Sequence, residues 1–181
     1  MPDPAPLVFE DPRRRTAALA VIRRMPPLKG ASLRIQSVRD LRDRRGPVHA
    51  GSFVRERRIA FDCTRAEFPR ILVHELGHFV WLRLGNPLRR DWERHLRGEL
   101  RAGIRGELGW SAEWRKLALH PGDPVRRSRR WREYCCEAFC DTSAWLWSGI
   151  SRHPEFTLAG KVRPARRKWF GLNLGGRELS I

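Results

Sequence analysis

Residues 64–85 read TRAEFPRILVHELGHFVWLRLG, and this stretch decides how the chain folds. Thr64 and Glu67 fit a capping box, in which each side chain accepts a hydrogen bond from the free backbone amide of the other residue. The apolar residues that follow predict a largely buried helix. Gly85 is a typical helix stop, so we expect the helix to end at about Leu84.

Two histidines on this predicted helix are four residues apart, in the run HELGH. His74 and His78 project from one helical face, so both imidazoles can bind the same metal ion, and zinc suits this pair. Glu75 is offset by one residue, where its carboxylate can take a proton from a zinc-bound water. The alternative is two histidines that are merely packed or exposed on a helix. We predict a catalytic zinc site.

A catalytic zinc ion usually has three protein ligands, so a third is expected downstream. Glu133 and Glu137 lie at i and i+4 of a second predicted helix, roughly residues 126–148. One of them can bind the metal while the other accepts the N–H of a ligand histidine. Glu133 is a better candidate than His95, whose neighbours include none of the further residues expected around such a ligand. Gly77 lacks a side chain, which allows the two helices to approach closely.

The HELGH run, followed by Glu133 and by the run EAF at residues 137–139, resembles the gluzincin clan of zinc peptidases. It is most similar to the catalytic domain of anthrax lethal factor and to small regulatory peptidases that cleave bacterial repressors. The resemblance covers residues 59–148. It implies zinc held by His74, His78 and Glu133, with Glu137 beside them and Glu75 as the base. In the repressor-cleaving group, alanine follows the ligand glutamate, which favours Glu137.

Two further groups of residues are candidates for roles in the site. Members of the clan supply a Tyr or His donor for the oxyanion, and the candidates here are Arg126, Arg127, Tyr134, His120 and His153. Cys136 and Cys140 share the helix face of Glu133, so one of them could bind metal or act as a redox trigger. The alternative role for both cysteines is that of small buried hydrophobic residues.

Outside the two helices the sequence predicts an α+β fold of the minimal zincin type. Alternating apolar residues at Leu33 and Ile35, and at Ile59 and Phe61, predict half-buried strands of a small antiparallel sheet packed against helices. Residues 1–12 are expected to form an irregular arm and residues 13–25 a basic helix. We expect residues 1–181 to form a single domain, with residues 59–148 as its catalytic core.

The chain is strongly basic, with 37 Lys and Arg, 20 Asp and Glu, and a formal net charge of +17. Such a charge attracts nucleic acid or an acidic protein substrate, although a biased genome composition would also produce it. No apolar run is long enough for a membrane span, and the four cysteines show no disulfide framework, so a cytoplasmic protein is expected. The expected function is hydrolysis of a peptide bond in a protein. The alternative is nucleic-acid binding with a structural or inactive zinc site.

Overall fold

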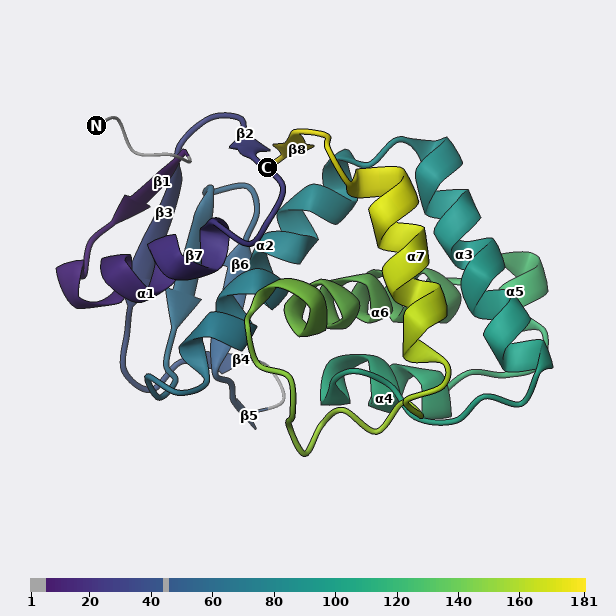
Figure 1. The fold of residues 1–181 in the computed structure, drawn as a ribbon. Coiled ribbons are helices and arrows are strands. Elements are labelled where there is room, and N and C mark those ends of the chain that lie inside the picture. Colours follow the sequence, from purple (N-terminus) through teal and green to yellow (C-terminus); the bar gives the residue numbers. More distant parts are fainter. Residues whose placement is uncertain (1–5, 44–45) are drawn as a thin grey trace.

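The computed structural model describes residues 6–43 and 46–181 (Figure 1). The helices in these residues are α1 (Pro12–Ile22), α2 (Phe68–Arg83), α3 (Asn86–Arg101), α4 (Trp110–Leu117), α5 (Asp123–Arg126), α6 (Arg129–Trp147) and α7 (Arg163–Leu174). The strands are β1 (Leu7–Phe9), β2 (Leu28–Lys29), β3 (Leu33–Ser37), β4 (Arg42–Asp43), β5 (Gly46–Pro47), β6 (Ala50–Phe53), β7 (Arg58–Phe61) and β8 (Leu179–Ser180). Small sheets therefore pack against helices, as expected for a mixed fold.

The largest sheet of the described residues has the strand order β1-β3-β7-β6. The pairs β1·β3 and β3·β7 are parallel, and only β6·β7 is antiparallel. The expectation of an antiparallel sheet is therefore wrong for two of its three strand pairs. The reason lies in the connections: α1 carries the chain from β1 back to the start of β3, and such a crossover joins parallel strands.

The expected irregular arm over residues 1–12 is also wrong in part. Residues 1–5 lie outside the described residues, but Leu7–Phe9 forms β1 and pairs with Leu33–Ile35. The next helix begins at Pro12 because Asp11 caps it, accepting a hydrogen bond from the Arg13 amide at 2.9 Å. Proline is tolerated at the first helical position because the backbone N–H that it lacks would have no partner within the helix. This helix ends at Ile22, earlier than expected.

Helix α2 forms where it was expected, but it begins only at Phe68 with Glu67 as its N-cap, so the expected capping box with Thr64 at the N-cap does not form in full. Thr64 Oγ1 accepts a hydrogen bond from the Glu67 amide at 3.3 Å, which forms a turn directly before the helix begins at Phe68. The helix ends at Arg83 with Leu84 as its cap. The side chains of Leu72 and Leu76 have no exposed area, because α2 lies between the sheet and helix α6 (Figure 1).

Helices α2 and α6 pack along much of their length, and Gly77 lies at a close approach between them. A Cβ atom added at Gly77 would lie 3.0 Å from Cys140 Sγ and 3.1 Å from Cys140 Cα. A larger residue at this position would push against Cys140, so glycine favours this close approach, and the two helices cross near Cys140. Helix α6 begins at Arg129, where the Ser128 hydroxyl accepts a hydrogen bond from the Trp131 amide at 3.2 Å.

The C-terminal segment, for which the sequence pattern indicated no structure, forms α7 and β8. Strand β8 pairs in parallel with β2, so the end of the chain returns to the N-terminal part (Figure 1). Helix α7 buries Trp169 and Phe170 in the main apolar core, which extends from Leu7 to Ile181. Within the described residues, no helix has the length and apolar character needed to cross a membrane.

Candidate metal centre

The two histidines of α2 and one glutamate of α6 bring three potential ligand atoms together. Glu137 Oε2 lies 3.3 Å from His74 Nε2 and 3.9 Å from His78 Nε2. All three ligand atoms lie within 4.8 Å of one another. Ligand atoms of a tetrahedral zinc site with bonds of about 2.0 Å are about 3.3 Å apart. The donor set and its spacing therefore fit a zinc ion with only small side-chain adjustments.

Glu133, the expected third ligand, does not join this group. Its side chain is 46% exposed and accepts a hydrogen bond from Arg129 Nε at 2.7 Å. The structure thus groups Glu137, and not Glu133, with the two histidines, which makes Glu137 the better candidate for the third ligand. The physical reason is the crossing point of the helices at Cys140, which directs the turn containing Glu137 toward His74. Glu133 lies one helical turn, about 5.4 Å, farther along α6.

Asp141 supports the site from the next turn of α6. Its Oδ1 lies 2.7 Å from His74 Nδ1, and its Oδ2 accepts a hydrogen bond from the Ala112 amide at 3.0 Å. A carboxylate on the outer nitrogen of a ligand histidine fixes the ring orientation and leaves the other nitrogen for the metal. Asp141 was not among the residues expected at the site, although its spacing of four from Glu137 was a usable signal.

Glu75 lines two cavities together with His74, and one of them also contains His78 and Glu137. Its side chain is buried, and the Ser52 hydroxyl donates a hydrogen bond to Glu75 Oε2 at 2.6 Å. Ser52 belongs to β6, the end strand of the sheet, and its hydroxyl also lies 3.1 Å from the Glu75 carbonyl oxygen. The strand therefore holds the carboxylate in one orientation. Ser52 carries no motif, so sequence reasoning missed it.

The site has an electrostatic preference for a cation. Burial opposes charge on Glu137, but the hydrogen bond from His74 and the charges of both histidines lower its pKa to about 2. Burial likewise lowers the pKa of His74, but the charge of Asp141 and the hydrogen bonds of both carboxylates raise it well above 6.5. Against the same effect of burial, Cys136 and Glu137 raise the pKa of His78 to about 9. The carboxylates therefore hold positive charge among these rings.

Two cavities meet at His74 and Glu75. One, of about 520 Å³, extends toward α4 and is lined by Trp110 and Trp114. The other, of about 360 Å³, extends along α2. Further residues that line it are Ser52, His78, Leu82, Arg115, Cys136 and Glu137. Ala50 of the end strand β6 lines both cavities, so they form a groove along this strand that passes the candidate ligands.

Arg115 is the cationic donor that the structure brings to the ligands. Its Nη2 lies 3.1 Å from Glu137 Oε1, and its Nη1 donates a hydrogen bond to the Ser111 carbonyl at 2.8 Å. Arg115 comes from α4, whose position depends on tertiary packing, and no sequence signal pointed to it. It was not among the expected oxyanion donors.

The expected donors lie elsewhere or have other partners. Tyr134 is buried and donates a hydrogen bond to Glu107 at 2.6 Å. Arg127 binds Glu93 at 2.7 Å, and His153 lies 3.1 Å from Glu67. Residues that face other parts of the molecule are Arg126, exposed on α5, His120, in a cavity with Arg97, and His95, stacked on Trp92. Neither His95 nor any of the expected donors lines the two cavities beside Glu75.

Cys136 lies on the outer side of His78. Its Sγ is 3.5 Å from His78 Nδ1, and Cys140 Sγ is within 4.8 Å of both atoms. The hydrogen bond from Cys140, aided by His78 and opposed by burial, lowers the pKa of Cys136 to about 6. None of the four cysteines, all of which are described, forms a disulfide.

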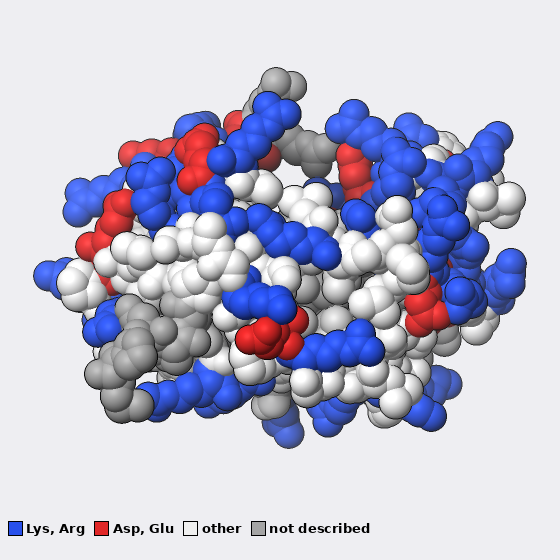
Figure 2. All heavy atoms as spheres, turned by 90° about the horizontal axis from the view of Figure 1, so that it is seen from above, with Lys and Arg blue, Asp and Glu red and all other residues white. Residues whose placement is uncertain are grey.

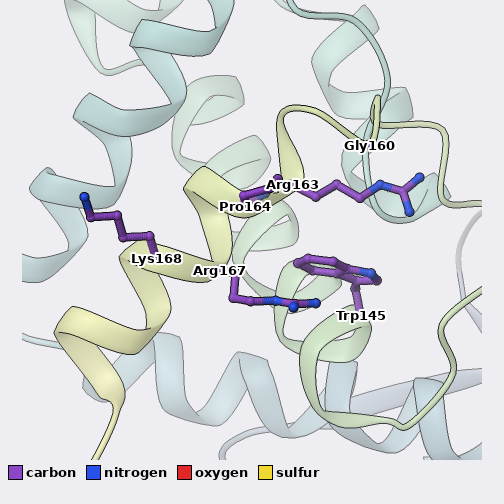
Figure 3. A pocket seen from close by; sticks show the side chains of 6 residues that line it. All are labelled: Trp145, Gly160, Arg163, Pro164, Arg167 and Lys168. Atoms are coloured by element: carbon purple, nitrogen blue, oxygen red, sulfur yellow. The ribbon is translucent and has the colours of Figure 1, made fainter.

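Basic residues also lie outside this groove. Figure 2 shows Lys and Arg over much of the face seen from above, with a dense group at the right edge near α3. A separate cavity of about 410 Å³ lies beside α7. There the Arg167 guanidinium lies 4.8 Å from the Trp145 ring centre, while Lys168 points away from it (Figure 3). This cationic and aromatic surface is distinct from the candidate metal centre.

Comparisons of the chain with protein-family models, with curated proteins and with solved structures gave no match. The proposed function is therefore inferred from the geometry of the site.

Replacing Glu137 by Ala is expected to weaken zinc binding at least ten-fold, because even groups that touch only a ligand typically contribute about 10–100-fold to metal affinity. Glu133→Ala is the matched control on the same helix and should keep the affinity of the parent. Competition with a chromophoric chelator measures both values. If Glu133→Ala lost the metal and Glu137→Ala kept it, the ligand assignment made from these distances would be wrong.

Proposed function

We propose that the chain is a zinc-dependent peptidase of the gluzincin type, which hydrolyses a peptide bond in a protein substrate. The observation that carries the proposal is the position of Glu75. Its carboxylate lies beside the group formed by His74, His78 and Glu137, and it does not form part of the ligand triangle. A structural zinc site needs four protein ligands and no neighbouring base, whereas a catalytic site keeps one position open.

The catalytic role of each residue is inferred from its contacts. Zinc, when bound, supplies a Lewis acid and makes a water molecule more acidic. Glu75, held by the Ser52 hydroxyl, accepts the proton of the attacking water and transfers it to the amine that leaves. Asp141 keeps the Nδ1 proton on His74. Arg115, whose guanidinium lines the groove, donates hydrogen bonds to the oxygen that gains negative charge.

The groove also suggests which substrate residues are preferred. Trp110 and Trp114 have parallel rings with centres 6.4 Å apart, and their side chains are 38% and 65% exposed. Both rings line the cavity that reaches Glu75. Exposed aromatic rings beside the reacting groups bind an apolar or aromatic substrate residue better than a charged one. The net charge of +17 would in addition attract substrates that are acidic outside this residue.

Cleavage of a peptide library tests the proposal. The protein is loaded with one zinc ion per chain and incubated with unstructured peptides of mixed sequence, and mass spectrometry locates each cleaved bond. We expect cleavage with an apolar or aromatic residue next to the bond on one side. A chelator should stop it and added zinc should restore it. Zinc-loaded protein that cleaves no peptide would count against a peptidase.

The same outcome would favour the alternative function, nucleic-acid binding by the basic surface. That function predicts an affinity for DNA that falls steeply as the salt concentration rises, because each Lys or Arg that contacts a phosphate releases a counterion. The cavity of Trp145 and Arg167 is a part of that surface where a base could stack (Figure 3). The two readouts, peptide products and salt-dependent DNA affinity, separate the two functions.

A further inference from the structure

A second group of potential ligand atoms adjoins the first and is rich in sulfur. It consists of Cys136 Sγ and Cys140 Sγ of α6 and the Nδ1 atom of His78. His78 belongs to both groups, because its Nε2 faces Glu137 and its Nδ1 faces Cys136. In the mechanism above, neither thiol has a role.

The spacing of these atoms matches a metal site. Cys136 Sγ lies 3.5 Å from His78 Nδ1. In a tetrahedral site with metal–sulfur bonds of about 2.3 Å and metal–nitrogen bonds of about 2.0 Å, these ligand atoms are about 3.5 Å apart. Two sulfur ligands of such a site are about 3.8 Å apart, and the three atoms here lie within 4.8 Å of one another. One ion can therefore bind all three.

A disulfide is the competing use of two neighbouring thiols, and the helix disfavours it. Residues four apart on a helix have Cβ atoms about 5–6 Å apart. A disulfide requires Cβ atoms about 3.5–4.5 Å apart, so α6 would have to distort before Cys136 and Cys140 could join. A metal ion between the sulfur atoms bridges the longer distance without distortion.

The cluster is accessible from one side. Cys136 is half-buried and lines the same cavity as His78 and Glu137, whereas Cys140 is fully buried at the contact with Gly77. An ion can therefore enter from the groove and be held against the helix crossing, with solvent as its fourth ligand. Soft thiolate ligands select ions such as Cd²⁺, Cu⁺ or Zn²⁺ over Mg²⁺ and Ca²⁺.

We propose that Cys136, Cys140 and His78 form a second metal site, which binds a thiophilic ion and competes with the first site for His78. On binding, both thiol protons leave to solvent and the sulfur atoms become thiolates. A neutral imidazole has a lone pair on only one of its nitrogens, because the other carries the proton. An ion on Nδ1 therefore weakens binding at Nε2, and the coupling is reciprocal. An excess of a thiophilic ion would thus weaken metal binding at the first site.

Cadmium is the probe, because a thiolate bound to Cd²⁺ gives a charge-transfer absorption band in the ultraviolet. We expect the full chain to develop this band at one ion per thiolate pair. The band should disappear in Cys136→Ser and in Cys140→Ser, and persist in the control Cys63→Ser. Cys136→Ser decides the case if Cys140→Ser fails to fold, because Cys136 is not part of the close helix contact. The proposal is overturned if the parent shows no band, or if the band survives in Cys136→Ser.

The test is independent of peptide cleavage. Glu137→Ala removes a ligand of the first site only, so it should keep the cadmium band and bind cadmium there at least as tightly as the parent. If the band is present but no peptide is cleaved, the thiolate site stands and the peptidase proposal fails. If peptides are cleaved but the band is absent, the peptidase proposal stands and the thiolate site fails. Weaker cadmium binding in Glu137→Ala would refute the competition for His78.

Discussion

Replacing Glu75 by Gln is expected to lower kcat/KM for peptide cleavage by about 10²–10⁴-fold, the range that a positioned general base contributes. The amide has the shape of the carboxylate and can still accept the hydrogen bond from Ser52, but it cannot accept a proton from water. The metal should remain, because Glu75 is outside the group formed by His74, His78 and Glu137. Zinc content and cleavage rate are measured on the same preparation.

The control for this prediction is Glu133→Gln, which makes the same chemical change on an exposed side chain. It should cleave at the rate of the parent. If Glu75→Gln cleaved as fast as the parent with zinc bound, Glu75 would not be the base. If the variant lost its zinc, Glu75 would instead be needed for binding, and the open position of the metal would have to lie elsewhere.

The sequence predicted the parts of the fold that depend on local patterns. The course of α2 follows from its apolar residues. The expected capping box forms only in half: the Thr64 side chain accepts the Glu67 amide, but the helix begins after Glu67, which makes no side-chain cap hydrogen bond. The direction of strand pairing was not predictable in this way. Alternation at Leu33 and Ile35 marks a strand but does not specify its neighbour, and the parallel pair of β1 and β3 depends on α1 lying between them.

The same distinction between local and tertiary features applies to the candidate site. His74, Glu75 and His78 lie within about one turn of one helix, so their relative positions follow from helix geometry alone. The choice between Glu133 and Glu137 depends on where α6 crosses α2, and the contact of Gly77 with Cys140 determines it. Ser52, Arg115 and Asp141 come from elements whose placement is a tertiary property. Sequence reasoning therefore predicted which side chains of α2 lie together, but not the residues of other elements that surround them.

A buried ion cluster connects the C-terminal helix to the site. Arg166 of α7 has no exposed area, and it binds Glu99 of α3 and Glu107 at 2.6 Å each. Glu107 also accepts hydrogen bonds from the Tyr134 hydroxyl at 2.6 Å and lies 3.0 Å from Lys116 Nζ of α4. Helix α4 carries the tryptophans and Arg115 of the groove. The cluster therefore holds the helix that forms one wall of the candidate site.

Arg166→Ala is expected to lower the free energy of unfolding by about 3–5 kcal/mol at pH 7, the usual cost of removing one partner from a buried ion pair. The variant leaves Glu99 and Glu107 buried without their main cation. The free energy of unfolding of a typical domain is about 5–15 kcal/mol, so the loss is large. Urea unfolding followed by circular dichroism measures it. The matched control is Arg167→Ala, because Arg167 is the next residue and is exposed.

The effect of Arg166→Ala should depend on pH in a defined direction. Burial raises the pKa of Glu99, but hydrogen bonds from His95 and Arg166 lower it from 4.5 to about 2. Because the folded pKa is below the unfolded value, this carboxylate contributes about 3 kcal/mol above pH 4.5, which is lost as the pH falls from 4.5 toward 2. Without Arg166 the buried carboxylates lose the cation that lowers their pKa. As the pH falls, the free energy of unfolding should therefore decrease less for the variant than for the parent. The difference between parent and variant should therefore shrink between pH 7 and pH 3. A difference that stayed constant would mean that Arg166 acts through packing and not through its charge.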